Sequence, residues 1–208
     1  MRDAQQIAIW ADQLRDIAAT GLRWSKSKYD DVRYTTLQNI SMEMLATATD
    51  EPTEEMEPLR ATVFSHVTPF STGDAGVVDE EGRILLIKRA DNHRWAMPGG
   101  AFEVGETPAE GAEREAFEET GIRCKSVALV GVFDSRFCGT TSRHQLYQFT
   151  FLCEPIEGDN QEASHAEEVE DVQWFARERI PENLDPGHVS RIPEVFRVWN
   201  GDRRAFFI

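Results

Sequence analysis

Three glutamates stand at spacings that an α-helix would bring onto one face. Glu115, Glu118 and Glu119 occupy positions i, i+3 and i+4, and such residues are neighbours on a helix surface. Like charges in this arrangement repel one another and destabilise a bare helix. Mg²⁺ or Mn²⁺ would relieve the repulsion, because both ions prefer oxygen ligands. The spacing therefore predicts a metal site, with a salt-bridged exposed face as the structural alternative.

The glutamates belong to a longer pattern that runs from Gly100 to Ile122. The residues at its fixed positions are Gly100, Glu106, Arg114, Glu115, Glu118, Glu119 and Gly121. A chance match to all of them would arise on the order of once in 10⁸ windows. The pattern matches the signature of the Nudix hydrolases, G-x5-E-x7-R-E-U-x-E-E-x-G-U, where U is aliphatic. This stretch thus resembles the catalytic box of that family.

The resemblance implies hydrolysis of a diphosphate linkage with Mg²⁺, or with Mn²⁺ in its place. The groups that would hold the ion are the backbone carbonyl of Gly99 and the side chains of Glu115, Glu118 and Glu119. A divalent ion neutralises charge on the phosphate oxygens and presents a water molecule in line with the bond that breaks. Glu115 would be either a third ligand or the base that positions this water.

The same resemblance assigns supporting roles. Glu106 and Arg114 would pair and hold the helix against its loop, and Gly100 and Gly121 would support the box. The general base lies either in the box or on a later loop. On that loop Glu168 is our candidate, together with Glu115, Glu118 and Glu119 as catalytic residues. A plain surface glutamate is the alternative for Glu168.

Recognition of the base and sugar would require other side chains. Arginines bind phosphates and aromatic rings stack on bases. The candidates are Arg136, Phe137, Arg143 and His144. Packing or solvent exposure is the alternative for each of them.

The composition is that of a globular protein with one core and a smaller appendage. Of its 208 residues, 40% are hydrophobic and 28% are charged. No apolar run approaches the roughly 20 residues of a membrane span, and the first residues lack the layout of a signal peptide, so we expect a cytoplasmic protein. Cys124, Cys138 and Cys153 are scattered and odd in number, which indicates neither a disulfide framework nor a zinc site.

The net charge of -15 bears on the binding partner. Nucleic-acid binding depends on Lys and Arg side chains that neutralise phosphates, so a nucleic-acid partner is disfavoured. The charge is compatible with a small substrate derived from a nucleotide and delivered with its metal. Most of the excess acid is explained by solubility alone.

Two amphipathic helices are predicted at the N-terminal end. The first, over residues 5–22, has apolar residues at spacings of three and four, namely Ile7, Trp10, Leu14 and Ile17. Gly21 is its expected stop, and Asp30 or Asp31 is the expected cap of the second helix. The inward stripe of the second helix is expected at Tyr34, Leu37, Ile40 and Met44. Such a hairpin cannot bury both apolar faces alone, so we expect a homodimer.

The stretch from Asp50 to Pro58 is acidic and contains prolines, which suits a linker or a short capped turn. We therefore expect a helical N-terminal domain over residues 1–60, for dimerisation or for covering the substrate, and a Nudix hydrolase domain over residues 66–208. This layout resembles the Nudix subgroup that acts on nucleoside diphosphates linked to a second group, including ADP-ribose and CDP-choline. An unrelated helical appendage that stabilises the fold is the alternative.

Strands and helices alternate from residue 72 onward. A hairpin is predicted from residues 76–78 and 84–89, and Thr107-Pro108-Ala109-Glu110 has the pattern of a capping box. Further strands are predicted over 130–133, 145–152 and 172–175, with a solvated acidic loop over 157–171 and a final helix near 192–199. The Nudix resemblance implies an α/β fold, an α/β/α sandwich with a mixed sheet, preceded by the small helical domain.

The reaction we expect yields a nucleoside monophosphate and a phosphorylated product. One alternative is a pyrophosphohydrolase that cleans the nucleoside triphosphate pool. Another is a non-catalytic Nudix ligand sensor, for which a broken box would be the expected mark, whereas this box is complete. In a third alternative, the N-terminal helices form a module that binds a partner or RNA. The acidic net charge disfavours this alternative.

Overall fold

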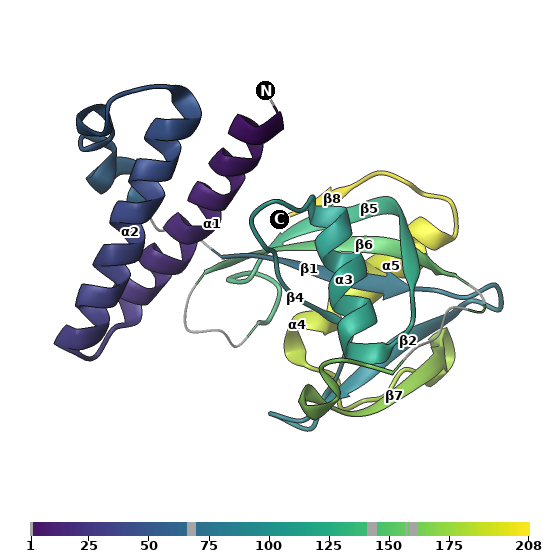
Figure 1. Cartoon of the computed structure of the whole chain (residues 1–208). Helices are drawn as coiled ribbons and strands as arrows, with labels where there is room; N and C mark the ends of the chain where they lie inside the picture. The colour runs from purple at the N-terminus through teal and green to yellow at the C-terminus, as the bar shows by residue number, and fades with distance from the viewer. Residues whose placement is uncertain (1, 66–69, 141–144, 157, 159–161) are drawn as a thin grey trace. The chain divides into compact units, whose positions relative to one another are not determined.

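The computed structural model describes residues 2–65, 70–140, 145–156, 158 and 162–208 (Figure 1). The chain divides into two compact units. The first comprises Met1–Thr68 with Glu103–Gly105, and the second comprises Pro69–Phe102 with Glu106–Ile208. Among the described helices, none is both long enough and apolar enough to cross a membrane.

Helices α1 (Arg2–Trp24) and α2 (Lys28–Thr49) pack along each other in the first unit. The buried side of α1 is formed by small residues, since Ala11 and Ala18 are almost fully enclosed. The Ser41 hydroxyl of α2 donates a hydrogen bond to the Ala11 carbonyl at 2.7 Å, which shows how closely the helices approach. The large residues Trp10 and Ile17 are 50% and 51% exposed. Ile7 and Leu14, the other residues of the predicted apolar stripe, are half-buried, so only part of that stripe is covered.

Two predicted helix boundaries were wrong. Gly21 does not end α1, which continues beyond it; a Cβ atom at this position would overlap the ring of Tyr34, so the glycine makes room for that ring. Neither Asp30 nor Asp31 caps α2. Ser27 does so, because its hydroxyl oxygen accepts a hydrogen bond from the Asp30 backbone N–H at 3.2 Å. The aspartates lie in the first turn, where negative charge complements the helix dipole.

The inward face of α2 also differs from the prediction. Tyr34, Leu37 and Met44 are half-buried, but Ile40 is exposed. The buried residues of the helix are Gln38, Ser41, Met42 and Ala46. Two short helical segments, η1 (Thr53–Met56) and η2 (Arg60–Phe64), place Met56 and Phe64 against Met42 and Ala46. The stretch after α2 is therefore part of this unit and not a free linker.

Two β-sheets form the centre of the second unit (Figure 1). The larger has the order β4-β1-β6-β5-β8, with β1 (Phe70–Val77) parallel to β6 (Leu146–Pro155). Its other strands are β4 (Gly99–Ala101), β5 (Cys124–Asp134) and β8 (Phe206–Phe207). The smaller, antiparallel sheet consists of β3 (Trp95–Ala96), β2 (Arg83–Arg89) and β7 (Val169–Ala176).

Helices α3 (Pro108–Thr120) and α5 (Arg191–Trp199) cover opposite faces of the larger sheet. On one face, Ala75 of β1 packs with Ala112 of α3. On the other, a Cβ at Gly76 would lie 2.6 Å from Val195 of α5, and successive strand residues point to opposite faces. The short elements are η3 (Ala166–Glu168), η4 (Arg177–Arg179) and α4 (Pro186–Val189). The predicted α/β/α sandwich with a mixed sheet is confirmed, and so is the helical region that precedes it.

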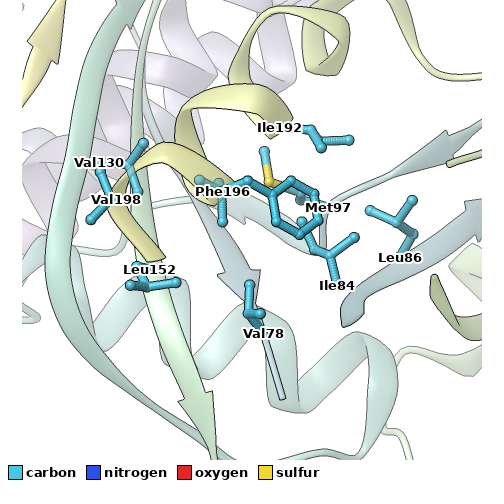
Figure 2. Packing of buried hydrophobic residues seen from close by; sticks show 10 residues of the cluster. Val78, Ile84, Leu86, Met97, Val130, Leu152, Ile192, Phe196 and Val198 are labelled. Carbon is cyan, nitrogen blue, oxygen red and sulfur yellow. The ribbon is translucent and has the colours of Figure 1, made fainter. Parts of the chain in front are cut away.

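A hydrophobic core lies between the two sheets and α5, and Figure 2 shows its side chains pointing toward one another. Its buried residues are Val78, Ile84, Leu86, Met97, Val130, Leu152, Ile192, Val195, Phe196 and Val198. Val78 and Ile84 are joined by an isolated antiparallel bridge. Beyond that bridge β1 and β2 belong to different sheets. The predicted hairpin is therefore present only next to its turn.

Candidate active site

The ends of α3 are fixed by local sequence. Thr107 Oγ1 accepts a hydrogen bond from the Glu110 backbone N–H at 3.3 Å, and a Glu110 carboxylate oxygen accepts one from the Thr107 N–H at 2.8 Å. This is the predicted capping box. Gly121 ends the helix in the left-handed conformation, with φ of 70°, which glycine adopts without strain. These two caps fix where α3 begins and ends, and so fix which side of the helix each of its glutamates occupies.

Arg114 connects α3 to the preceding loop. Its Nε and Nη2 atoms each donate to one carboxylate oxygen of Glu106 at 3.0 Å. Its Nη1 atom donates to Glu115 and to Glu118, each at 2.9 Å, and Nη2 also donates to the Ala101 carbonyl. One guanidinium thus ties the loop to the helix and partly neutralises two of the three clustered glutamates.

Gly99 and Gly100 allow β4 to lie against both β1 and α3. A Cβ at Gly99 would overlap the backbone of β1, and a Cβ at Gly100 would lie 2.5 Å from the Glu115 carboxyl carbon. The Gly99 N–H donates a hydrogen bond to Glu119 Oε2 at 2.8 Å. The two glycines therefore place the backbone next to the carboxylates of Glu115 and Glu119.

The pKa values of the Glu115 and Glu119 carboxylates are both raised. Burial raises the pKa of Glu119 to about 8, although the Gly99 N–H and Arg89 favour its ionised form; the charges of Glu115 and Glu168 add to the rise. Burial likewise raises the pKa of Glu115, an effect that Arg114 opposes. A bound cation would favour ionisation of both groups.

An outer cleft of about 700 Å³ opens over this part of the molecule. Its lining residues are Arg89, Ala90, Asp91, Gly99, Gly100, Ala101, Glu115, Glu119, His165, Glu167 and Glu168. Segment η3 brings Glu168 here because the Glu168 carbonyl accepts a hydrogen bond from the Ala90 N–H at 2.9 Å. The His165 N–H donates to the Glu118 carbonyl at 2.9 Å, so the loop is also fastened to α3.

The cleft unites some of the residues predicted from the sequence but not all. Gly99, Gly100, Glu115, Glu119 and Glu168 line it together. Of the other predicted metal ligands, Glu118 is not among the lining residues and is paired with Arg114. Sequence reasoning missed Arg89 and His165, for which the sequence held no recognisable signal.

The predicted substrate-binding residues do not reach the cleft where they can be placed. Arg136 donates to both Asp134 oxygens, with Nη2 at 2.7 Å from the nearer one, and its guanidinium lies 5.2 Å from the Phe137 ring centre. Neither Arg136 nor Phe137 lines the cleft. Their ion pair and ring contact explain them as local structure. Arg143 and His144 lie outside the described residues.

Within the described part of the chain, no group of three His, Cys, Asp or Glu side chains is already arranged to hold a metal ion. The contacts of Arg114 account for this, because they hold Glu115 and Glu118 on the guanidinium. The donor set nevertheless fits Mg²⁺ or Mn²⁺, since the carboxylates of Glu115 and Glu119 and the Gly99 backbone supply hard oxygen ligands beside one cleft.

Comparison with known proteins agrees with this geometry. Residues 71–195 match the family model described as the NUDIX domain. The chain belongs to the Nudix hydrolase family. Residues 5–59 of this Nudix hydrolase match a second family model, described as a UDP-X-like, N-terminal oligomerisation domain.

Of three similar proteins, two span nearly the whole enzyme and one spans about three fifths of it. YjhB of Bacillus subtilis, provisionally named an ADP-ribose pyrophosphatase, is 30% identical over 205 residues, which cover 95% of this chain and 94% of YjhB. An ADP-ribose pyrophosphatase of Methanocaldococcus jannaschii is 33% identical over 61% of this chain and 73% of its own. The crystal structure of a UDP-X diphosphatase superposes with a TM-score of 0.60 and 31% identity, covering 98% of both chains.

Proposed function

We propose that this Nudix hydrolase uses Mg²⁺, or Mn²⁺ in its place, to cleave the diphosphate of a nucleoside diphosphate linked to a second moiety. The substrate is of the ADP-ribose or CDP-choline type. The observation that carries the proposal is the outer cleft, which Glu115, Glu119 and Glu168 line together with Gly99. The similarity to YjhB and to the UDP-X diphosphatase along nearly the whole chain supports the substrate class.

The metal would be held by Glu115, Glu118, Glu119 and the Gly99 carbonyl. When bound there, it supplies positive charge for the phosphate oxygens and lowers the pKa of coordinated water. Glu118 would have to leave Arg114 to join these ligands, and the two contacts of Arg114 to Glu106 would keep the loop in place.

Glu168 takes a proton from the attacking water, with Glu115 as the other candidate base. The water oxygen forms a new bond to one phosphorus, and the bond from that phosphorus to the bridging oxygen breaks. The bridging oxygen leaves with the second phosphate and carries the displaced electron pair. The products are a nucleoside monophosphate and a phosphorylated X. Arg89, which lines the same cleft, donates hydrogen bonds to the phosphates.

The test is product analysis with purified protein, Mg²⁺ and a panel that contains ADP-ribose, CDP-choline, nucleoside diphosphate sugars and nucleoside triphosphates. We expect a nucleoside monophosphate and a phosphorylated X from the diphosphate derivatives. Release of pyrophosphate from triphosphates alone would favour the pool-cleaning alternative, and intact substrates throughout would refute hydrolysis. Glu119→Gln should lower kcat about 100-fold or more, whereas the matched control Glu178→Gln, exposed and outside the lining of the cleft, should not.

We propose in addition that residues 1–60 act as a dimerisation domain and that residues 66–208 form the catalytic domain of a homodimer. Large apolar side chains on the two helices are exposed, including Trp10, Ile17, Tyr29, Val32 and Ile40. Exposed large apolar side chains suit an interface with another chain, and the oligomerisation family matched by residues 5–59 supports it. A monomeric mass of the full chain in solution would contradict the homodimer. Cytoplasmic location stays a prediction.

A further inference from the structure

The chain crosses from one sheet to the other just before Gly99. Strand β3 belongs to the smaller sheet and β4, which begins at Gly99, belongs to the larger one. Met97 and Pro98 lie between these strands and form the crossing. Because proline has no backbone N–H, the crossing offers one backbone donor, the N–H of Met97. The partner of that donor therefore decides how the crossing is held.

The pairing of β4 with β1 sets the direction of the Gly99 carbonyl. Asp74 of β1 stands directly opposite Gly99, and the Ala75 N–H donates a hydrogen bond to the Pro98 carbonyl at 2.9 Å. Because backbone groups of successive residues point to alternate sides of a strand, the N–H and carbonyl of Gly99 point away from β1. The N–H donates to Glu119 at 2.8 Å. The Gly99 carbonyl therefore faces the same side as the Glu119 carboxylate.

His188 of α4 is the partner of the crossing. Its Nδ1 atom accepts a hydrogen bond from the Met97 N–H at 3.2 Å, and its side chain is buried. Burial lowers the pKa of His188 well below its usual value, and the positive charges of Arg191 and Arg89 act in the same direction. The imidazole is therefore neutral, as an acceptor at Nδ1 requires. Because the Met97 side chain also packs in the hydrophobic core (Figure 2), the crossing is held by both its backbone and its side chain.

Arg191 of α5 connects His188 to β1. Its Nε atom donates a hydrogen bond to the carbonyl of Gly187, the residue before His188, at 2.7 Å. Its guanidinium also pairs with Asp74, which stands opposite Gly99. A continuous set of contacts thus runs from β1 through α5 and α4 to the crossing. Gly99 lies between the two ends of this set.

Stability alone does not account for a charged pair in this place. The Arg191 and Asp74 side chains are only 1% and 9% exposed. Removal of two charges from water is costly, and apolar side chains of similar volume often stabilise a fold as well or better. A buried pair does, however, favour one arrangement of the elements that carry it. Here those elements are β1 and α5, on either side of the contacts that hold the crossing.

We propose that Asp74, Arg191 and His188 are positioning residues that hold the Gly99 carbonyl toward the divalent ion and thereby raise the affinity for that ion. This inference rests on the proposed function, because it concerns the same metal site. Partners that orient a metal ligand typically change metal affinity by about 10- to 100-fold when they are removed. Two helices that supply none of the proposed ligands, α4 and α5, would then control how tightly the metal binds.

The experiment measures Mn²⁺ binding without substrate, from the electron paramagnetic resonance signal of the unbound ion. His188→Leu removes the acceptor for the Met97 N–H and should raise the Kd for Mn²⁺ about 10-fold. His188→Asn places a carbonyl oxygen at the position of Nδ1 and should keep the Kd within about threefold of wild type. The control is Phe133→Leu, a buried position on β5 outside these contacts. It should lower stability but keep the Kd within about twofold.

A second variant and a second measurement cover the case in which His188→Leu does not fold. The double variant Asp74→Leu/Arg191→Met replaces the buried pair by apolar side chains, which such sites often tolerate, and should also raise the Kd about 10-fold. Amide hydrogen exchange, followed by NMR in the metal-free protein, reports on Gly99 directly. The Gly99 amide should exchange faster in this variant and in His188→Leu than in Phe133→Leu.

Three results would overturn the positioning role. These are a wild-type Kd in the folded variants that lack the contacts, an equal rise in His188→Leu and His188→Asn, and an equal rise in Phe133→Leu. Absence of Mn²⁺ binding by wild type would instead refute the metal site of the proposed function. In that case unchanged exchange of the Gly99 amide would refute the hold on Gly99 as well, whereas faster exchange in His188→Leu would support it.

Discussion

Replacement of Glu119 by glutamine should remove a pH-dependent loss of stability from the metal-free enzyme. The variant keeps the shape of the side chain and an oxygen that can accept the Gly99 hydrogen bond, but it cannot ionise. In wild type the folded-state pKa of about 8 stands above the reference value of 4.5. The folded state therefore binds this proton more tightly than the unfolded state does. The resulting stabilisation is complete below pH 4.5 and is lost as the pH rises through about 8.

The magnitude follows from the size of the shift. Each pKa unit corresponds to about 1.36 kcal/mol, and only 8% of the Glu119 surface is exposed, so solvent screens the effect little. Between about pH 5.5 and pH 8.5 the contribution to the free energy of unfolding falls by about 3 kcal/mol. Glutamine lacks this contribution. The free energy of unfolding of Glu119→Gln, taken relative to that of wild type, should therefore rise by about 3 kcal/mol between about pH 5.5 and pH 8.5.

The assay is urea unfolding in the presence of a chelator, at a series of pH values, for wild type, Glu119→Gln and Glu167→Gln. Glu167 is exposed on the rim of the same cleft, so its variant should follow the wild-type dependence on pH. Parallel curves for wild type and Glu119→Gln would refute the argument, because they would show that folding does not change the proton affinity of Glu119.

Three further outcomes can be measured independently. Thr107→Ala removes the cap of α3 and should lower the free energy of unfolding by about 1 kcal/mol; an unchanged urea midpoint would contradict the role of the cap. Gly21→Ala should lower the melting temperature of the first unit, because its methyl group would collide with Tyr34, and a variant as stable as wild type would show that the ring moves freely. Ile17→Asp, on the exposed side of α1, should reduce the molecular mass of a dimer measured by light scattering, and an unchanged mass would place the interface elsewhere than beside Ile17 and Trp10.

The parts that the sequence predicted well are those decided by nearby residues. The caps of α3 depend on Thr107, Glu110 and Gly121, whose partners lie within a few positions along the chain. The strands and the final helix likewise follow local patterns of apolar residues. These signals are strong because the atoms that make the contacts are close in sequence as well as in space.

The two N-terminal helices show where local patterns mislead. The spacing of Trp10 and Ile17 correctly predicted an apolar face on α1. Helix α2, however, packs on the side of α1 that carries Ala11 and Ala18. A sequence shows that a helix has apolar surface. It does not show which part meets the same chain and which part is left for another molecule.

The sequence predicted the residues of the site that lie close together along the chain, but not those that distant segments bring to it. Glu115 and Glu119 came from the spacing of the box, but the presence of Arg89 depends on where β2 ends. The approach of Glu168 depends on the pairing of β2 with β7, where Lys88 stands opposite Asp171 and a bulge follows. Contacts between segments so far apart in the chain leave no periodic trace. Arg136 was selected by residue type alone, and its partner Asp134 explains it without a substrate.

Under the proposed function, metal binding would exchange one cation, the guanidinium of Arg114, for another. That guanidinium already pairs with Glu115 and Glu118, so the chain itself partly neutralises the acidic face of α3. A divalent ion would compete with the Arg114 guanidinium for Glu115 and Glu118. Its net affinity would be the difference between its own attraction to these carboxylates and that of the guanidinium. At the proposed site, the contacts of Arg114 would therefore lower the net affinity for the ion, and the occupancy of the site would depend on the free concentration of that ion.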